Sequence, residues 1–133
     1  ESSYHTKMVE EVSLWIKNYN PSTSDLMIFS DLPNTPRHKL PEIFNNFRPD
    51  VYARNLTSRN VFIGEAKTGP DLETPHSVRQ IRSFLKYLSN EENSIFIIAT
   101  SWEMIRCAKV LVSALQKEVC AEKVQLQFLT VWP

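Results

Sequence analysis

An acid and a lysine, Glu65 and Lys67, lie two residues apart near the middle of the chain, and the only two glycines of the sequence, Gly64 and Gly69, flank them. The apolar run at residues 61–63 predicts a strand that ends at this point. Side chains two residues apart in a strand point to the same face, so we expect the carboxylate and the ammonium group side by side. The simplest interpretation is an ordinary ion pair at a solvated strand end.

A second carboxylate, Asp50, favours a more specific interpretation. Residues 48–53 predict another strand, and the polar stretch after it predicts a tight connection. A symmetric hairpin with a loop of two or four residues pairs Asp50 with Glu65 and places Gly64 opposite Val51, where a helix can pack close to the sheet. Two carboxylates at cross-strand distance repel each other unless a cation lies between them, and a hard divalent ion is the natural one. An odd loop or a β-bulge would change this register.

The order Pro49-Asp50 and then Glu65-Ala66-Lys67, on two apolar strands between two helices, resembles the signature of the PD-(D/E)XK nuclease superfamily. The continuation through residues 65–72, with Gln80 on a helix, is similar to its VRR-NUC and RecB-like branches, and the small size is similar to that of junction resolvases, which act as dimers. The resemblance implies a restriction-endonuclease-like αβββαβ core and cleavage of DNA that leaves 5′-phosphate ends.

The chemistry of phosphodiester hydrolysis gives these residues roles. Asp50, Glu65 and the main-chain carbonyl of Ala66 would hold Mg²⁺ or Mn²⁺, and Lys67 would orient the attacking water or stabilise the charge of the transition state. By resemblance, Gln80 would position Lys67 or water.

The resemblance also implies a glutamate from the first helix at the metal. Glu11 borders the apolar stripe of that helix and is the better candidate, with Glu10 as the fallback; the alternative is that both are solvated helix acids. In RecB-like relatives a tyrosine follows the glutamine by four residues, whereas this chain has Phe84 there and Tyr87 further on.

The periodicity of the chain predicts one α/β domain over residues 1–133, with a mixed sheet flanked by helices. The order is that of the αβββαβ core with a helix and a strand appended. The predicted helices span residues 5–19, 74–89 and a segment from residue 101, and the predicted strands span residues 25–29, 48–53, 61–66, 94–100 and 124–131, with an irregular, locally basic stretch at residues 31–47.

A basic stripe on the helix after Lys67 predicts contacts to DNA phosphates, although the formal net charge of the chain is zero. Its members are Arg79, Arg82 and Lys86, with Arg54 as a further candidate. We expect DNA as the partner, with a homodimer or a larger complex as further possibilities.

The two cysteines have neither the spacing of a disulfide framework nor that of a zinc site, so we expect an intracellular protein, cytoplasmic or nucleoid-associated. No apolar run is long enough to span a membrane. The chain begins with glutamate, which leaves open that it is part of a longer protein. The predicted function is a metal-dependent deoxyribonuclease. The alternatives are an inactive nuclease-like subunit that binds nucleic acid or protein, and an unrelated α/β interaction domain.

Overall fold

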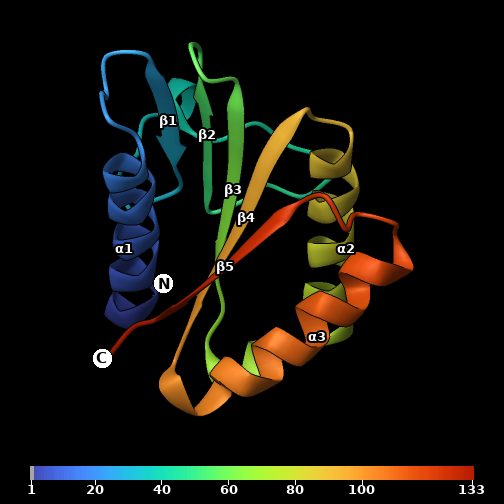
Figure 1. Ribbon diagram of the computed structural model, residues 1–133. Coiled ribbons are helices and arrows are strands. Elements are labelled where there is room, and N and C mark those ends of the chain that lie inside the picture. The colour runs from blue at the N-terminus through green and yellow to red at the C-terminus, as the bar shows by residue number, and fades with distance from the viewer. Residues whose placement is uncertain (1) are drawn as a thin grey trace.

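The computed structural model describes residues 2–133 and consists of a five-stranded mixed sheet between two helical layers (Figure 1). α1 covers one face of the sheet, and α2 and α3 cover the other. The predicted order of helices and strands is confirmed. The elements are α1 (Ser3–Tyr19), β1 (Leu26–Ser30), β2 (Val51–Asn55), β3 (Asn60–Ala66), α2 (Pro75–Ser89), β4 (Asn93–Thr100), α3 (Ile105–Glu118) and β5 (Gln125–Thr130).

The strands lie in the sheet in chain order, with β1, β2 and β3 antiparallel and β3, β4 and β5 parallel. The central hairpin has the predicted register, because Val51 pairs with Gly64 and four residues, Leu56–Arg59, connect β2 to β3. β4 is buried on both faces, as its unbroken apolar sequence predicted. The carboxyl ends of the three parallel strands therefore meet at one edge of the sheet.

α1 begins two residues before its predicted start, because the side chain of Ser2 accepts a hydrogen bond from the His5 N–H (3.1 Å) and so caps the helix. Its buried stripe of Met8, Val9, Val12 and Ile16 packs on the sheet. The contact is closest at Gly64, where an added Cβ would lie 2.3 Å from Val12 Cγ1. The predicted reason for a glycine at this position, a close approach of helix and sheet, is confirmed.

α2 starts as predicted at Thr74, whose hydroxyl accepts a hydrogen bond from the Ser77 N–H (3.2 Å), with a proline in the first turn. Its apolar stripe packs against the face of the sheet opposite α1, together with α3. The buried members of that stripe are Ile81, Phe84, Leu85 and Leu88.

The far end of the β2–β3 hairpin is fastened by two buried asparagines. Asn55 Oδ1 accepts hydrogen bonds from the N–H groups of Thr57 and Ser58 (2.9 Å each), which closes the loop. Asn55 Nδ2 donates to Asn20 Oδ1 (2.7 Å), and Asn20 Nδ2 in turn donates to the carbonyl of Ile16. The loop is thereby tied to the last turn of α1.

The long connection between β1 and β2 is partly ordered by apolar contacts. It contains a short 3₁₀ turn, Arg37–Lys39, and a bridge between Phe44 and Phe47. The ring of Phe44 packs against Tyr52 and Tyr87, with centroid distances of 5.3 and 4.2 Å. Among residues 2–133, no helix has the length and apolar character needed to cross a lipid bilayer.

Candidate active site

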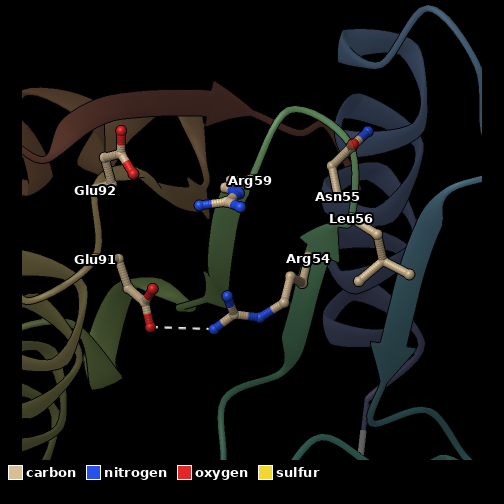
Figure 2. A pocket seen from close by; sticks show the side chains of 6 residues that line it. All are labelled: Arg54, Asn55, Leu56, Arg59, Glu91 and Glu92. Atoms are coloured by element: carbon tan, nitrogen blue, oxygen red, sulfur yellow. Dashed lines mark hydrogen bonds and ion pairs between the residues drawn. The ribbon is translucent and has the colours of Figure 1, made fainter.

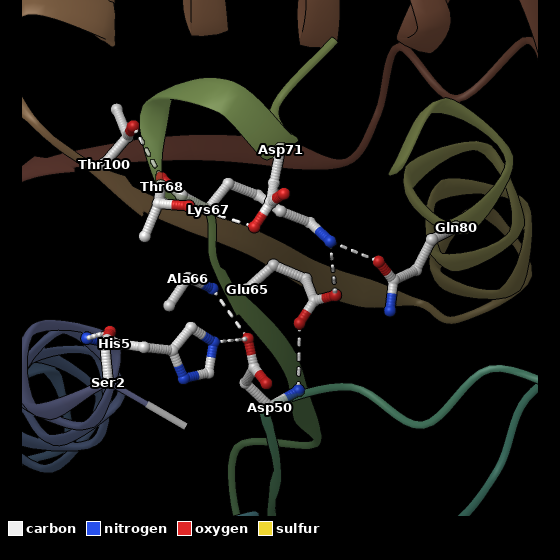
Figure 3. A network of polar contacts seen from close by, with 10 residues as sticks. All are labelled: Ser2, His5, Asp50, Glu65, Ala66, Lys67, Thr68, Asp71, Gln80 and Thr100. Atoms are coloured by element: carbon white, nitrogen blue, oxygen red, sulfur yellow. Dashed lines mark hydrogen bonds and ion pairs between the residues drawn. The ribbon is translucent and has the colours of Figure 1, made fainter. Parts of the chain in front are cut away.

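Asp50 and Glu65 face each other across the start of the β2–β3 hairpin (Figure 3). The Asp50 N–H donates to Glu65 Oε2 (3.0 Å), and the Ala66 N–H donates to Asp50 Oδ2 (2.8 Å). The two carboxylates thus bind the main chain of each other's strand. The predicted pairing is confirmed, and it follows from the four-residue loop and the absence of a bulge between residues 51 and 64.

Glu65 is the most deeply buried acid of this group, with 1% of its surface exposed. Its Oε1 accepts no hydrogen bond from any of the described residues, and the nearest cation is Lys67 Nζ at 3.8 Å. Burial, reinforced by the charge of Asp50, raises the pKa of Glu65 well above its ordinary value, and Lys67 only partly offsets this. A buried, unsatisfied carboxylate oxygen is costly, so this position is suited to a bound cation.

Asp50 behaves in the opposite way. Burial alone would raise its pKa, but hydrogen bonds from His5, Glu65 and the Ala66 N–H outweigh burial and lower the pKa below its ordinary value. The environments of the two acids therefore push their pKa values in opposite directions, so that Glu65 takes up a proton more readily than Asp50. Such a division is typical of functional acid pairs.

Lys67 is held in place from several sides and is only 9% exposed. Its Nζ donates a short hydrogen bond to Gln80 Oε1 on α2, so the predicted contact of Gln80 with Lys67 is confirmed (Figure 3). Its main chain is fixed to the end of β4: the Lys67 N–H donates to the Ala99 carbonyl (3.0 Å), and the Thr100 hydroxyl donates to the Lys67 carbonyl (2.8 Å). Phe84, which replaces the expected tyrosine, is buried in the core and does not disturb this contact.

The prediction that Glu11 belongs to this group is wrong, and Glu10 does not replace it. Both glutamates are exposed on α1, and neither lines the cleft. The physical reason is the alternation of β3: Gly64 and Ala66 face α1, whereas Glu65 and Lys67 face α2. A side chain in the middle of α1 is therefore on the wrong side of the sheet.

The residue of α1 that does reach the acids is His5, in the first turn, and sequence reasoning missed it. His5 Nε2 lies 3.5 Å from Asp50 Oδ2. His5 lies four residues before Val9 and seven before Val12, so its place on the buried stripe was the available signal. The cleft, of about 270 Å³, is also lined by Asp71, Thr74, His76 and Ser77.

Of the four cations predicted to bind phosphate, two are exposed on α2 and two form ion pairs within the fold. Arg79 and Lys86 are exposed on α2. Arg82 forms an ion pair with Glu118 on α3 (2.5 Å). Arg54 lies at the other end of β2 from Asp50, in a separate hollow, where it pairs with Glu91 (3.1 Å) (Figure 2).

Arg54 also donates to the hydroxyls of Tyr52 (3.1 Å) and Tyr87 (3.4 Å). Its guanidinium is thus engaged by three partners within the fold. The structure does not bring Arg54 to the cleft, and the predicted DNA contact at this residue is not supported by its position.

The residues of the cleft fit a hard divalent ion, although residues 2–133 contain no cluster of three or more His, Cys, Asp or Glu side chains arranged as a metal site. Mg²⁺ is usually bound by one or two carboxylates, with water filling the other positions. Two facing carboxylates, one with an unsatisfied buried oxygen, meet that requirement. Because the two carboxylates offer only oxygen atoms, the pair is suited to hard ions such as Mg²⁺ or Mn²⁺ rather than to softer metals.

No protein-family model, no curated protein and no solved structure matches the chain.

Proposed function

We propose that the protein is a metal-dependent nuclease of the PD-(D/E)XK type that hydrolyses DNA phosphodiester bonds. One observation carries this proposal: Asp50 and the buried Glu65 face each other, with an unsatisfied oxygen on Glu65 and the fixed ammonium group of Lys67 at 3.8 Å from it. The helix, three strands, helix and strand that precede α3 have the order of a restriction-endonuclease-like core, which supports the same proposal.

In this proposal Asp50, Glu65 and the main-chain carbonyl of Ala66 hold Mg²⁺ or Mn²⁺. The ion, when bound, supplies Lewis acidity and lowers the pKa of a water molecule. Positive charge at this point also offsets the repulsion between the two acids and favours the ionised form of Glu65.

Lys67 contributes a positive charge whose position is set before substrate arrives. Gln80 orients the ammonium group, and Thr100 and Ala99 hold the main chain, so little reorganisation is needed when negative charge develops on the phosphate. His5 holds Asp50 from the side of α1 and is a positioning residue. The exposed Arg79 and Lys86 are the cations of α2 that remain for the DNA backbone.

An inactive nuclease-like subunit is the second candidate function. It is favoured by the formal net charge of zero and by the ion pairs that engage Arg54 and Arg82, since a protein that grips DNA strongly usually has a clear basic excess. The two functions differ in one direct observable, which is cleavage of DNA that depends on a divalent ion.

The test is a cleavage assay on single-stranded, linear duplex, plasmid and four-way-junction DNA with Mg²⁺ or Mn²⁺. We expect cleavage that a chelator abolishes and that Asp50→Ala, Glu65→Ala or Lys67→Ala lowers by at least about 100-fold. Glu11→Ala is the matched control, because it removes an acid from the opposite side of the sheet and should leave cleavage unchanged. Equal cleavage by the wild type and Lys67→Ala would identify a contaminant and refute the mechanism.

Binding of the ion can be measured separately from cleavage. A ligand that binds only the folded state raises the melting temperature, so Mg²⁺ or Mn²⁺ should stabilise the wild type and not Asp50→Ala. Stabilisation of both proteins to the same extent would place the ion elsewhere.

A further inference from the structure

The edge of the sheet that holds the candidate site also presents two exposed tryptophans. β3, β4 and β5 are parallel, and the chain leaves them through Lys67, Trp102 and Trp132. The turn after β4, the C-terminus and the first turn of α1 lie at the same end of the molecule in Figure 1. Open α/β sheets bind their ligands outside the carboxyl ends of the strands, so this edge is where a substrate is expected.

The two indole rings form a shared aromatic surface. Their centroids lie 6.2 Å apart, and the ring planes are inclined by 31°. Trp102 is 55% exposed and Trp132 is 62% exposed, so both large aromatic rings are open to contact with a ligand. They line a hollow of about 310 Å³ together with Tyr4, Gly69, Glu103 and Met104.

This aromatic surface is fastened to the candidate site by hydrogen bonds. The hydroxyl of Thr100 binds the carbonyl of Lys67 (2.8 Å), and the carbonyl of Thr100 accepts from the N–H of Val131 (3.0 Å), directly before Trp132. Trp102 follows Thr100 by two residues, a span of at most about 7 Å. The segments that carry the two rings are therefore attached to the main chain of Lys67.

The first turn of α1 also connects the segment that carries Trp132 to the acid pair. The hydroxyl of Tyr4 donates to the carbonyl of Val131 (2.6 Å), while the neighbouring His5 contacts Asp50. One turn of α1 thus contacts both Asp50 of the acid pair and Val131, the residue before Trp132.

The charges around the rings indicate what they bind. Glu103 lies in the hollow, so a phosphate is unsuited to the hollow itself, whereas a flat, uncharged base is not repelled. Lys7 lies at its rim, with Nζ donating to the carbonyl of Trp132 (2.8 Å), and can meet the backbone of a strand. Aromatic rings stack on any base that is free of its partner, but the bases of an intact duplex are already stacked.

We propose that Trp102 and Trp132 stack unpaired bases of single-stranded DNA and hold the strand so that a neighbouring phosphodiester enters the cleft of Asp50, Glu65 and Lys67. The stacking of bases is inferred from the aromatic surface alone. The delivery of a phosphodiester to the cleft rests on the proposed nuclease function. It assigns DNA with an unpaired segment as the preferred substrate.

The test measures binding without cleavage. Fluorescence anisotropy of a labelled oligothymidine, in the presence of chelator, gives the affinity of the wild type, of Trp102→Ala, of Trp132→Ala and of the double variant. We expect roughly ten-fold weaker binding for each single variant, since stacking contributes on that order per base. Replacement by phenylalanine should restore most of the affinity, and Val110→Ala, which changes an exposed apolar residue on α3, should have no effect.

The outcomes separate the two proposals. Trp-dependent binding of single strands, with weaker binding of a duplex of the same length, supports the inference even if no cleavage is found, in which case only the nuclease proposal fails. Unchanged affinity in the double variant overturns the inference, even if chelator-sensitive cleavage is present. A wild-type dimer that the double variant converts to a monomer, with oligonucleotide binding unchanged, also overturns it, because the tryptophans would then form a protein interface.

Discussion

Replacing Gly64 with alanine places a methyl group between β3 and α1, where Val12 Cγ1 would lie only 2.3 Å from it. An ordinary contact between carbon atoms needs about 3.5–4.0 Å, so the helix or the strand must move by about 1.2 Å, or Val12 must leave its preferred rotamer. Overpacking of this kind costs about 1–3 kcal/mol. We expect a loss of about 2 kcal/mol and a melting temperature lower by about 6–10 °C for a domain of this size.

A second substitution tests whether Val12 is the cause. In Val12→Ala the clashing methyl is absent, and the new methyl at position 64 would meet Val51 Cβ at 3.5 Å and the Cβ of residue 12 at 3.6 Å, which are ordinary contacts. Val12→Ala alone should cost about 2 kcal/mol. Independent effects would sum to about 4 kcal/mol, whereas we expect the double variant to lose about 2 kcal/mol or less, because the added methyl fills the space that Val12 vacates.

The other glycine of the chain is the matched control. Gly69 has no positive φ angle, and an added Cβ would lie 3.4 Å from Met104 Cγ, so Gly69→Ala should change stability by no more than about 1 kcal/mol. Urea and thermal unfolding of the four variants measure these differences. Equal stability of Gly64→Ala and Gly69→Ala, or full additivity with Val12→Ala, would refute the close packing of α1 on β3.

Three further predictions concern Glu65, Asn55 and Arg54. Because burial and the charge of Asp50 raise the pKa of Glu65, this carboxyl stabilises the fold while it is protonated, below its ordinary value near 4.5, and the stabilisation is lost as the pH rises through the raised pKa. In chelator, the melting temperature of the wild type relative to Glu65→Gln should therefore fall as the pH rises above the ordinary value of 4.5. A difference independent of pH would contradict the assignment. Asn55→Ala leaves the loop N–H groups and Asn20 without their partner and should cost about 2–3 kcal/mol in urea unfolding, and a loss below about 0.5 kcal/mol would show that the network is dispensable. Arg54→Met breaks a partly exposed ion pair and should cost no more than about 1 kcal/mol, with DNA affinity unchanged in a filter-binding assay; weaker DNA binding would restore Arg54 as a phosphate contact.

The sequence was sufficient to predict the central part of the candidate site. Two strands of clear apolar character and a short polar connection left few possible registers, so the pairing of Asp50 with Glu65 followed from counting residues. The alternation of side chains in a strand then placed Lys67 with the acids, and the helical start at Thr74 brought Gln80 into reach.

The sequence does not show which face of the sheet a helix covers, or which side chains far apart in the chain come into contact. The family resemblance implies a glutamate on the first helix and periodicity favours Glu11, but periodicity does not say which face of the sheet the helix covers. The partners of Arg54 and Arg82 are Glu91 and Glu118, 37 and 36 residues further along the chain, so an exposed basic stripe could not be distinguished from paired charges. His5 escaped notice for a similar reason, since its value depends on where the first turn of α1 meets the start of β2.

The four-residue loop at Leu56–Arg59 determines more than the shape of its own end of the hairpin. Pairing in a hairpin is counted from its turn, so one inserted or deleted residue in this loop would shift β2 against β3 along their whole length. Asp50 would then lose its place opposite Glu65, and the reciprocal bonds between each carboxylate and the other strand could not form. The length of a surface loop, normally a freely varied property of a protein, here determines how two acids pair at the opposite end of the hairpin.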